Sequence, residues 1–330
     1  MNRISTAGNY QSALLNLLTA QNQQKEAQTR VSTRKIATDM AGFGRGAESL
    51  TALKATQSRA QGFLDTGDAV AARLESQDLS LNRIGDAITS ARAAIGAVLS
   101  SDSANVLMLE LEGQFQSVQN GLNAQHQGNF LFAGADSANA PVTVTSLADL
   151  SAAPSVAATF GNDNLRPTSR LSESTSVQTG YLASDVGTAI FQVFRDIQQY
   201  QEGTAVTITD AGPPAVTTTY TPDPNPALRL TGRPSDAVKT FLTAQLKRLD
   251  AAGAGVLDSI SRNGSLQKQV ETTNAGHAAQ VASLEDMVSK KTDADLAQAI
   301  TDLQLAQVAV QASAQVISQL SQVSLLNYLR

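Results

Sequence analysis

Apolar residues recur at seven-residue steps in two long stretches of this chain, at residues 47–122 and 235–329. Between them, residues 135–234 hold all nine prolines and most of the threonine, serine and valine runs. A seven-residue apolar repeat places one stripe along a helix, and that stripe needs a partner helix to cover it. The pattern is therefore typical of two coiled-coil partners joined through an insertion, as in a strut of an assembly, and not of an enzyme.

The same periodicity predicts individual helices. Series at 53–95 and 242–284 predict one long helix in each stretch, and spacings of three and four predict a shorter helix over 108–122. Thr292, with a carboxylate three residues later, predicts the N-cap of a last helix. That helix carries at seven-residue steps Leu296, Leu303, Val310 and Ile317.

The middle of the chain has another pattern. Runs of β-branched residues with alternation are typical of short strands, and clusters of proline mark turns. The strands are expected around Val142, Val144, 206–208 and 216–220, with one helix over 190–197. The predicted fold is therefore mainly α, with elongated N- and C-terminal helical arms that form a coiled-coil or helical-bundle rod and a small, β-rich α+β domain inserted between them.

Composition argues against several classes of function. The net charge is −5 and no long lysine or arginine run occurs, which argues against nucleic acid or an anionic membrane as partner. The absence of cysteine excludes disulfides, thiolate metal sites and thiol catalysis. No apolar run reaches the roughly 18–20 residues of a membrane span. The N-terminus also lacks the pattern of a cleaved secretory signal, which by itself predicts a cytosolic chain.

No catalytic, cofactor-binding or metal-binding residue is predicted. The two histidines, His126 and His277, are far apart, and neither lies in a zinc or nucleophile motif. His277 falls on a seven-residue series and is expected to be a satisfied interface histidine. The glycines Gly42, Gly44 and Gly46 lack the preceding strand and the lysine of a phosphate loop, so they are interpreted as a hinge.

Five short motifs then point to a family. They are residues 3–6 (RIST), 31–42 (VSTRKIATDMAG), 128–134 (GNFLFAG), 295–300 (DLAQAI) and 320–329 (LSQVSLLNYL). Their order and their positions resemble those of the flagellin superfamily, and within it those of hook–filament junction proteins. Arg34 departs from the family pattern because it stands where the family usually has glycine. Thr38-Asp39-Met40 replaces the family's paired aspartates, and both departures concern the geometry of the local turn.

The resemblance implies a division of the chain. Residues 1–46 and 290–330 would be terminal assembly helices, disordered in the monomer and ordered as an inner coiled-coil layer in the assembly. Residues 47–134 and 235–289 would form the helical rod, and 135–234 an outward-facing α+β domain. The heptad and composition patterns give a matching segmentation.

The resemblance also implies a location and partners. Such a chain would be exported unfolded through the flagellar type III channel with an uncleaved signal, which overturns the cytosolic prediction. It would self-assemble in a helical ring, contact hook-associated protein 1 on the hook side and flagellin on the filament side, and bind an export chaperone beforehand.

The expected function is thus a structural junction adaptor of the bacterial flagellum. Two alternatives stay open: a flagellin that forms the filament itself, and, from another class, a coiled-coil surface protein that binds a ligand or adheres through residues 135–234. The expected assembly interface consists of Leu14, Leu18, Leu296, Ile300, Leu303, Val310, Ile317 and Leu320.

Overall fold

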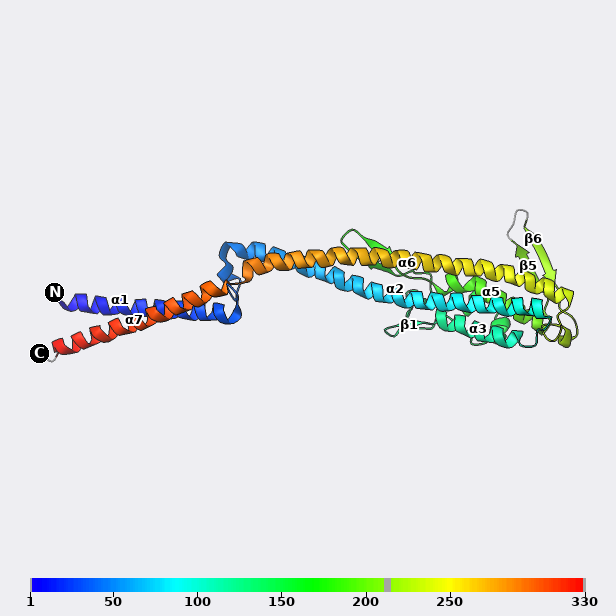
Figure 1. Ribbon diagram of the computed structural model, residues 1–330, viewed down its shortest axis with the longest axis horizontal. Helices are drawn as coiled ribbons and strands as arrows, with labels where there is room; N and C mark the ends of the chain where they lie inside the picture. Colours follow the sequence, from blue (N-terminus) through cyan, green and yellow to red (C-terminus); the bar gives the residue numbers. More distant parts are fainter. Residues whose placement is uncertain (1, 211–214, 329–330) are drawn as a thin grey trace. The chain divides into compact units, whose positions relative to one another are not determined.

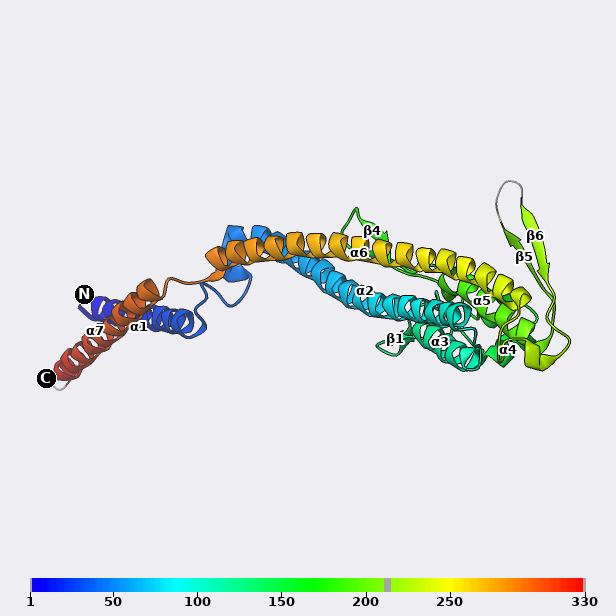
Figure 2. The same cartoon turned by 45° about the vertical axis from the view of Figure 1, so that its right-hand side comes forward.

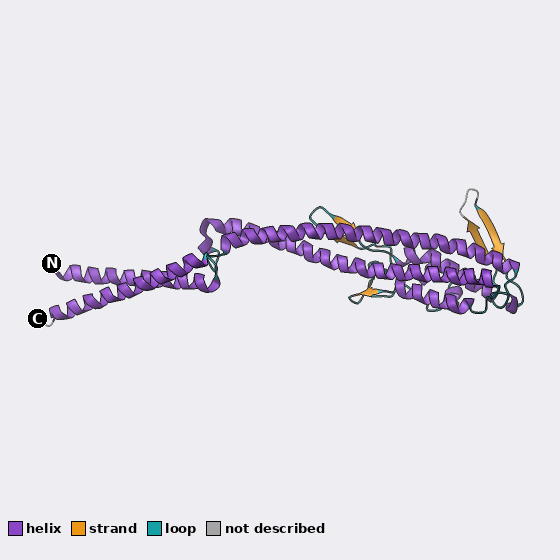
Figure 3. Cartoon of the chain, in the orientation of Figure 1, coloured by secondary structure: helices purple, strands orange, loops and turns teal. Residues whose placement is uncertain are grey.

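The structure, a computed structural model, describes residues 2–210 and 215–328 and is mainly helical (Figures 1 and 3). Its long helices are α1 (Asn2–Thr33), α2 (Ala47–Ser101), α6 (Asp236–Thr292) and α7 (Leu296–Tyr328). The predicted fold class, mainly α with a small strand-containing middle, is confirmed. The chain divides into a terminal unit, Met1–Gln61 with Ala278–Arg330, and a central unit, Gly62–His277. Each unit is described by itself.

The long helices form where proline is absent and an apolar stripe is continuous, since proline removes a backbone donor and clashes with the preceding turn. Of the predicted series on α2, the members from Ala60 to Ile95 are all buried. On α6 the buried members run from Leu242 to Val270 and include Asn263. The Asn263 side-chain amide donates to the Leu74 carbonyl oxygen at 2.9 Å, so a polar residue on the stripe ties α6 to α2.

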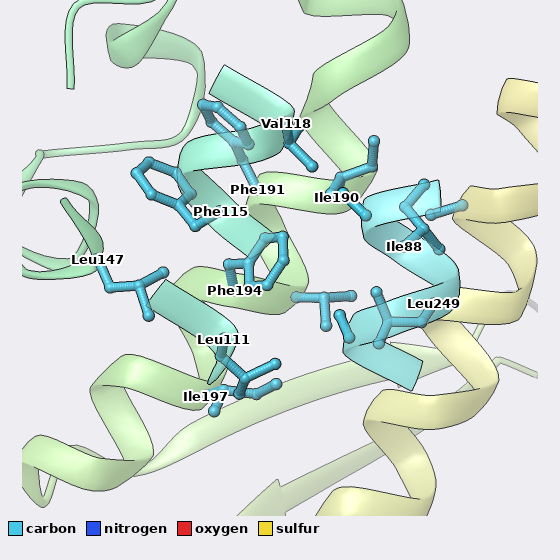
Figure 4. Packing of buried hydrophobic residues seen from close by; sticks show 14 of the residues in the cluster. Ile88, Leu111, Phe115, Val118, Leu147, Ile190, Phe191, Phe194, Ile197 and Leu249 are labelled. Atoms are coloured by element: carbon cyan, nitrogen blue, oxygen red, sulfur yellow. The ribbon is translucent and has the colours of Figure 1, made fainter. Parts of the chain in front are cut away.

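The core of the central unit is completed by two shorter helices, α3 (Leu107–Leu122) and α5 (Ala183–Glu202). Figure 4 shows their side chains interdigitating beside α2 and α6. The Phe115 ring lies 5.2 Å from that of Phe191 and 6.0 Å from that of Phe194, between ring centroids. A buried ion pair of Asp196 and Arg248 links α5 to α6 at the edge of this core.

Smaller elements connect these helices. Helix α4 spans Leu147–Ala152, and the 3₁₀ helices are η1 (Ala41–Gly46), η2 (Ala157–Thr159) and η3 (Pro226–Leu228). Three antiparallel hairpins, labelled in part in Figure 2, pair β1 (Gln125–His126) with β2 (Asn129–Phe130), β3 (Thr168–Arg170) with β4 (Ser176–Gln178), and β5 (Val206–Asp210) with β6 (Val216–Tyr220).

The predictions for the middle of the chain are confirmed in part. Strands β5 and β6 cover the two longer predicted strands. Val142 makes only a single bridge to Phe160, and Val144 lies in no strand. Helix α5 extends well beyond the predicted 190–197, because its apolar face continues to Ala183 and Tyr200 and buries against the core. Residues 135–234 thus supply one of the helices of the central unit's core.

Candidate assembly interface

Helices α1 and α7 of the terminal unit run antiparallel and pack on each other through alanine. The buried residues are Ala13, Ala20 and Ala27 on α1 and Ala299 and Ala306 on α7, at steps of seven on each helix. Ala27 and Ala306 line the same groove, and beside them Arg30 lies 3.9 Å from Asp302. We call the five buried alanines of α1 and α7 the alanine seam. Small side chains at every second turn let two helices approach closely, as at other small-residue interfaces.

Several large apolar residues of both helices remain exposed when the alanine seam is formed. Leu15, Leu18 and Leu305 are 61%, 53% and 63% exposed. We define the outer apolar faces as the exposed residues Leu14, Leu15 and Leu18 of α1 and Leu296, Ile300, Leu305, Val308 and Val316 of α7. Soluble monomers rarely leave so many large apolar side chains in water unless another surface covers them.

The predicted interface residues fall into two groups. Leu14, Leu18, Leu296 and Ile300 belong to the outer apolar faces. Leu303, Val310, Ile317 and Leu320 are half-buried beside the alanine seam. The five alanines of the seam were missed by sequence reasoning, although alanine at positions 13, 20 and 27 repeats at seven-residue steps. A search for repeats of leucine, isoleucine and valine does not detect this repeat of alanine.

A second feature of the terminal unit joins the loop after α1 to the loop before α7. The Ile36 N–H donates to the Thr292 carbonyl oxygen at 2.8 Å, and the Ala294 N–H donates to the Arg34 carbonyl oxygen at 3.0 Å. The Lys35 ammonium pairs with the Asp293 carboxylate and also lies 3.4 Å from the Thr292 hydroxyl. We call residues 34–36 and 292–294 the clasp. It fixes the ends of α1 and α6 to each other.

The predicted N-cap at Thr292 is wrong. Helix α6 continues through Thr292, and α7 begins at Leu296. The cap is Asp295, whose carboxylate accepts from the N–H groups of Ala297 and Gln298 at 2.9 and 3.2 Å. An acidic side chain at this position satisfies donors of the first turn that have no partner within the helix. Thr292 is buried in the clasp instead.

The ion pair of Lys35 and Asp293 in the clasp is expected to be sensitive to acid. Hydrogen bonds from Lys35, then Ser289 and Thr292, lower the pKa of Asp293 from 3.8 to about 2. The pKa of Asp293 is lower in the folded chain than in the unfolded one. The ion pair therefore stabilises the folded terminal unit fully above about pH 4, and this stabilisation is lost as the pH falls through 2. We expect carbon-13 NMR to find the Asp293 carboxyl titrating near pH 2, and Lys35→Met to raise that pKa. Lys290→Met, which breaks a neighbouring pair with Asp286, is the control and leaves it unchanged. Titration at 3.8 or above in the unaltered chain would contradict the clasp.

Arg34 stands in the left-handed region, with φ of 57°, immediately after α1. Its N–H still donates to the Arg30 carbonyl oxygen at 2.8 Å, as at a helix C-terminus. A residue with a side chain pays roughly 1–2 kcal/mol in this conformation. Arg34→Gly is therefore expected to raise the free energy of unfolding of the terminal unit by about 1 kcal/mol in urea titrations. Arg34→Ala, which keeps the Cβ, is the matched control and should bring no gain; equal effects of the two changes would sink the explanation.

The three predicted hinge glycines occupy different environments. Gly44 has φ of 50° and ψ of −126°, where a side chain is strained. A Cβ on Gly42 would lie 2.4 Å from the Ala37 Cβ. Gly46 has open space and no positive φ. Two of the three positions thus require glycine for stereochemical reasons, and hinge motion stays a prediction.

Both histidines lie in the central unit with polar partners. His126 Nδ1 is 2.9 Å from the Ser76 hydroxyl, and His277 Nε2 is 2.8 Å from the Leu171 carbonyl oxygen. The His277 ring also stacks on Phe63, with centroids 5.5 Å apart. Within residues 2–210 and 215–328, no group of three metal-ligating side chains occurs, and no helix there is long and apolar enough to cross a bilayer.

Comparison with known proteins identifies the C-terminal region by sequence. Residues 246–329 match the model of the bacterial flagellin C-terminal helical region. This match takes in most of α6 and α7, and it confirms the resemblance to the flagellin superfamily. No curated protein matches the chain by sequence.

Two solved structures share the fold. A chain assigned as a flagellar hook-associated protein of Vibrio parahaemolyticus has a TM-score of 0.52 at 13% identity, over 77% of this chain and 99% of that one. FlgL of Bacillus cereus has a TM-score of 0.51 at 13% identity, over 73% of this chain and 98% of that one. At this identity the likeness concerns the fold alone.

Proposed function

With a flagellin C-terminal helical region at residues 246–329 as the premise, we propose that this chain is a structural component of the bacterial flagellum. Its specific role is that of a junction adaptor that connects the hook to the flagellin filament. The likeness of its fold to a hook-associated protein and to FlgL supports this role. So does the turn at residues 128–134, which resembles that of junction proteins.

The observation that carries the proposal is that α1 and α7 each have a buried alanine side and an exposed apolar side. The alanine seam joins the two helices within one chain, and it leaves the outer apolar faces uncovered. Full burial of a leucine or isoleucine side chain stabilises by about 1.5–3 kcal/mol. Copies that set these faces against one another would therefore gain free energy in assembly that one chain alone does not have.

In this scheme the terminal segments become helical only after the chain has been exported. Residues 1–46 and 290–330 would remain disordered during export through the flagellar type III channel. After export, α1 and α7 would pair through the alanine seam, and neighbouring copies would then cover the outer apolar faces. The partners in this scheme are further copies in a helical ring, hook-associated protein 1, flagellin and an export chaperone. The mature location is extracellular, in the flagellum.

A filament-forming flagellin is the second candidate, because the matching family model is that of the flagellin C-terminal region itself. The two roles differ in copy number. A junction protein is present once per ring position, whereas a flagellin is present along the whole filament. Quantitative mass spectrometry of purified flagella, with the chain's peptides compared against those of the major filament protein, distinguishes them.

Deletion of the chain in its host tests the junction role. We expect electron microscopy to find hooks without filaments, and flagellin to be shed into the medium. Attached filaments of normal length in the deletion strain would overturn the junction role. Re-expression of the full chain should restore attachment, which separates loss of this chain from effects on neighbouring genes.

A further inference from the structure

A groove of about 480 Å³ lies in the central unit between α2 and the β1–β2 hairpin. Figures 1 and 2 show the hairpin, marked by β1, beside α2. The hairpin turns through Gln127 and Gly128, which have φ of 52° and 81°. Two successive positive φ values are those of a tight two-residue hairpin turn. The turn brings Asn129 and Phe130 to the groove wall, opposite Arg73 of α2.

Arg73 is the only charged residue that lines this groove. Its side chain is partly buried, and burial lowers the pKa of its guanidinium. The Nε atom is buried without a hydrogen-bond partner, and no carboxylate of the described chain pairs with it. Elsewhere on α2, Arg92 pairs with Asp250 at 2.5 Å although both are more than half exposed. Of these two arginines, Arg73 is the more deeply buried and is the one without a carboxylate partner in the described part of the chain.

Gln77 lies one helical turn beyond Arg73, on the same side of α2. Its side chain is fully buried, and neither its amide nitrogen nor its amide oxygen has a hydrogen-bond partner in the described chain. A buried polar group without a partner costs about 1–3 kcal/mol. Two residues one turn apart on α2 thus carry polar atoms without partners, in a helix whose other buried positions are mostly apolar. Of the two, Arg73 lines the groove and Gln77 lies next to it along the helix.

The remaining lining suits a carboxylic acid side chain. Asn129 and Ser137 supply polar groups at the rim, and the Ser137 hydroxyl already donates to the Asn129 side chain at 3.1 Å. Phe130 and Val70 supply apolar surface for the methylene groups of an incoming glutamate or aspartate. A guanidinium in a partly desolvated groove binds a carboxylate more strongly than one in open water, because the local dielectric is lower.

We propose that this groove binds a carboxylate-bearing side chain of a second copy of the chain, with Arg73 as its counter-ion. The inference rests on the proposed self-assembly. Each copy brings 29 acidic residues against 24 basic ones, so a neighbouring copy offers carboxylates in excess. Assembly through the outer apolar faces would bring copies side by side. Each Arg73 would then acquire in the assembly the ion pair that it lacks within its own chain.

A photo-cross-link from the groove tests this. Phe130 is replaced by p-benzoylphenylalanine in the full-length chain, and flagella that contain it are irradiated and analysed by mass spectrometry. We expect a covalent dimer of the chain, joined through a peptide that carries an aspartate or glutamate. Arg73→Gln is expected to lower the dimer yield about tenfold, and Arg73→Lys to lower it less. Arg83→Gln is the matched control, since Arg83 is an exposed arginine of the same helix, and it should leave the yield unchanged.

The outcomes separate this proposal from the proposed function. If the chain is present in purified flagella but cross-links only to another protein, or through a peptide without an acidic residue, the second-copy assignment is overturned. It is also overturned if Arg73→Gln and Arg83→Gln change the yield equally. If the unaltered chain is absent from flagella, the proposed function fails first. Circular dichroism of Arg73→Gln excludes loss of folding as the cause of a lower yield.

Discussion

Replacing Asp196 by alanine is expected to lower the free energy of unfolding of the central unit by about 3–5 kcal/mol. The carboxylate of Asp196 is only 5% exposed and pairs with Arg248, which is 24% exposed. Gln192 donates to the other carboxylate oxygen at 2.8 Å, and Arg248 also donates to the Gln245 side-chain oxygen at 3.0 Å. Without the carboxylate, the Arg248 guanidinium would stay partly buried without a counter-charge, and Gln192 would lose its acceptor.

Urea unfolding followed by circular dichroism measures this effect. Asp250→Ala is the matched control: it removes an acid of the same helix bundle, on α6, that pairs with Arg92, but both of those side chains are more than half exposed. Exposed pairs are worth about 0–1 kcal/mol, so a small change is expected there. The double change Asp196→Leu with Arg248→Met should recover most of the loss, because both charges are then removed. Equal effects of Asp196→Ala and Asp250→Ala would contradict the buried-pair argument.

Sequence periodicity predicted the long helices well because their burial follows one repeated rule. Every predicted member of the α2 series from Ala60 to Ile95 is buried, since seven-residue spacing places these residues on one side of the helix, where the core lies. Strands β5 and β6 were found for a similar local reason, namely β-branched residues on both sides of a turn.

The errors arose where the structure depends on a neighbour and not on a local pattern. The alanine seam was missed because alanine is also the commonest neutral helix former, so its burial becomes visible only when α1 lies against α7. The N-cap was assigned to Thr292 and not Asp295 because the local pattern permits both, and the pairing of residues 34–36 with 292–294 decides between them. Arg73 gave no signal at all, since a lone arginine on a helix is ordinarily solvated.

Placing an aspartate on the outer apolar faces is expected to remove the chain from the flagellum without unfolding it. In Leu18→Asp or Ile300→Asp the substituted side chain is solvated in the single chain, because both positions are exposed and the alanine seam is untouched. In an assembly each change forfeits about 1.5–3 kcal/mol of apolar burial and adds the desolvation of a carboxylate. A total above about 4 kcal/mol corresponds to a loss of roughly a thousandfold in association. Leu303→Asp and Ile317→Asp should also block incorporation, but with some loss of helix pairing, because both residues are half-buried beside the seam.

Three measurements decide this prediction: far-ultraviolet circular dichroism of the purified chain, motility, and the amount of the chain in isolated flagella. Asn16→Asp is the control, because it brings the same charge to α1 at an exposed polar position whose helix neighbours do not belong to the outer apolar face. We expect unchanged helicity in Leu18→Asp and Ile300→Asp, with incorporation lost in both and kept in Asn16→Asp. Normal incorporation of Leu18→Asp would mean that the leucines of α1 stay in water in the assembly. Loss of helicity in that variant would mean instead that the outer apolar face of α1 contributes to the pairing with α7.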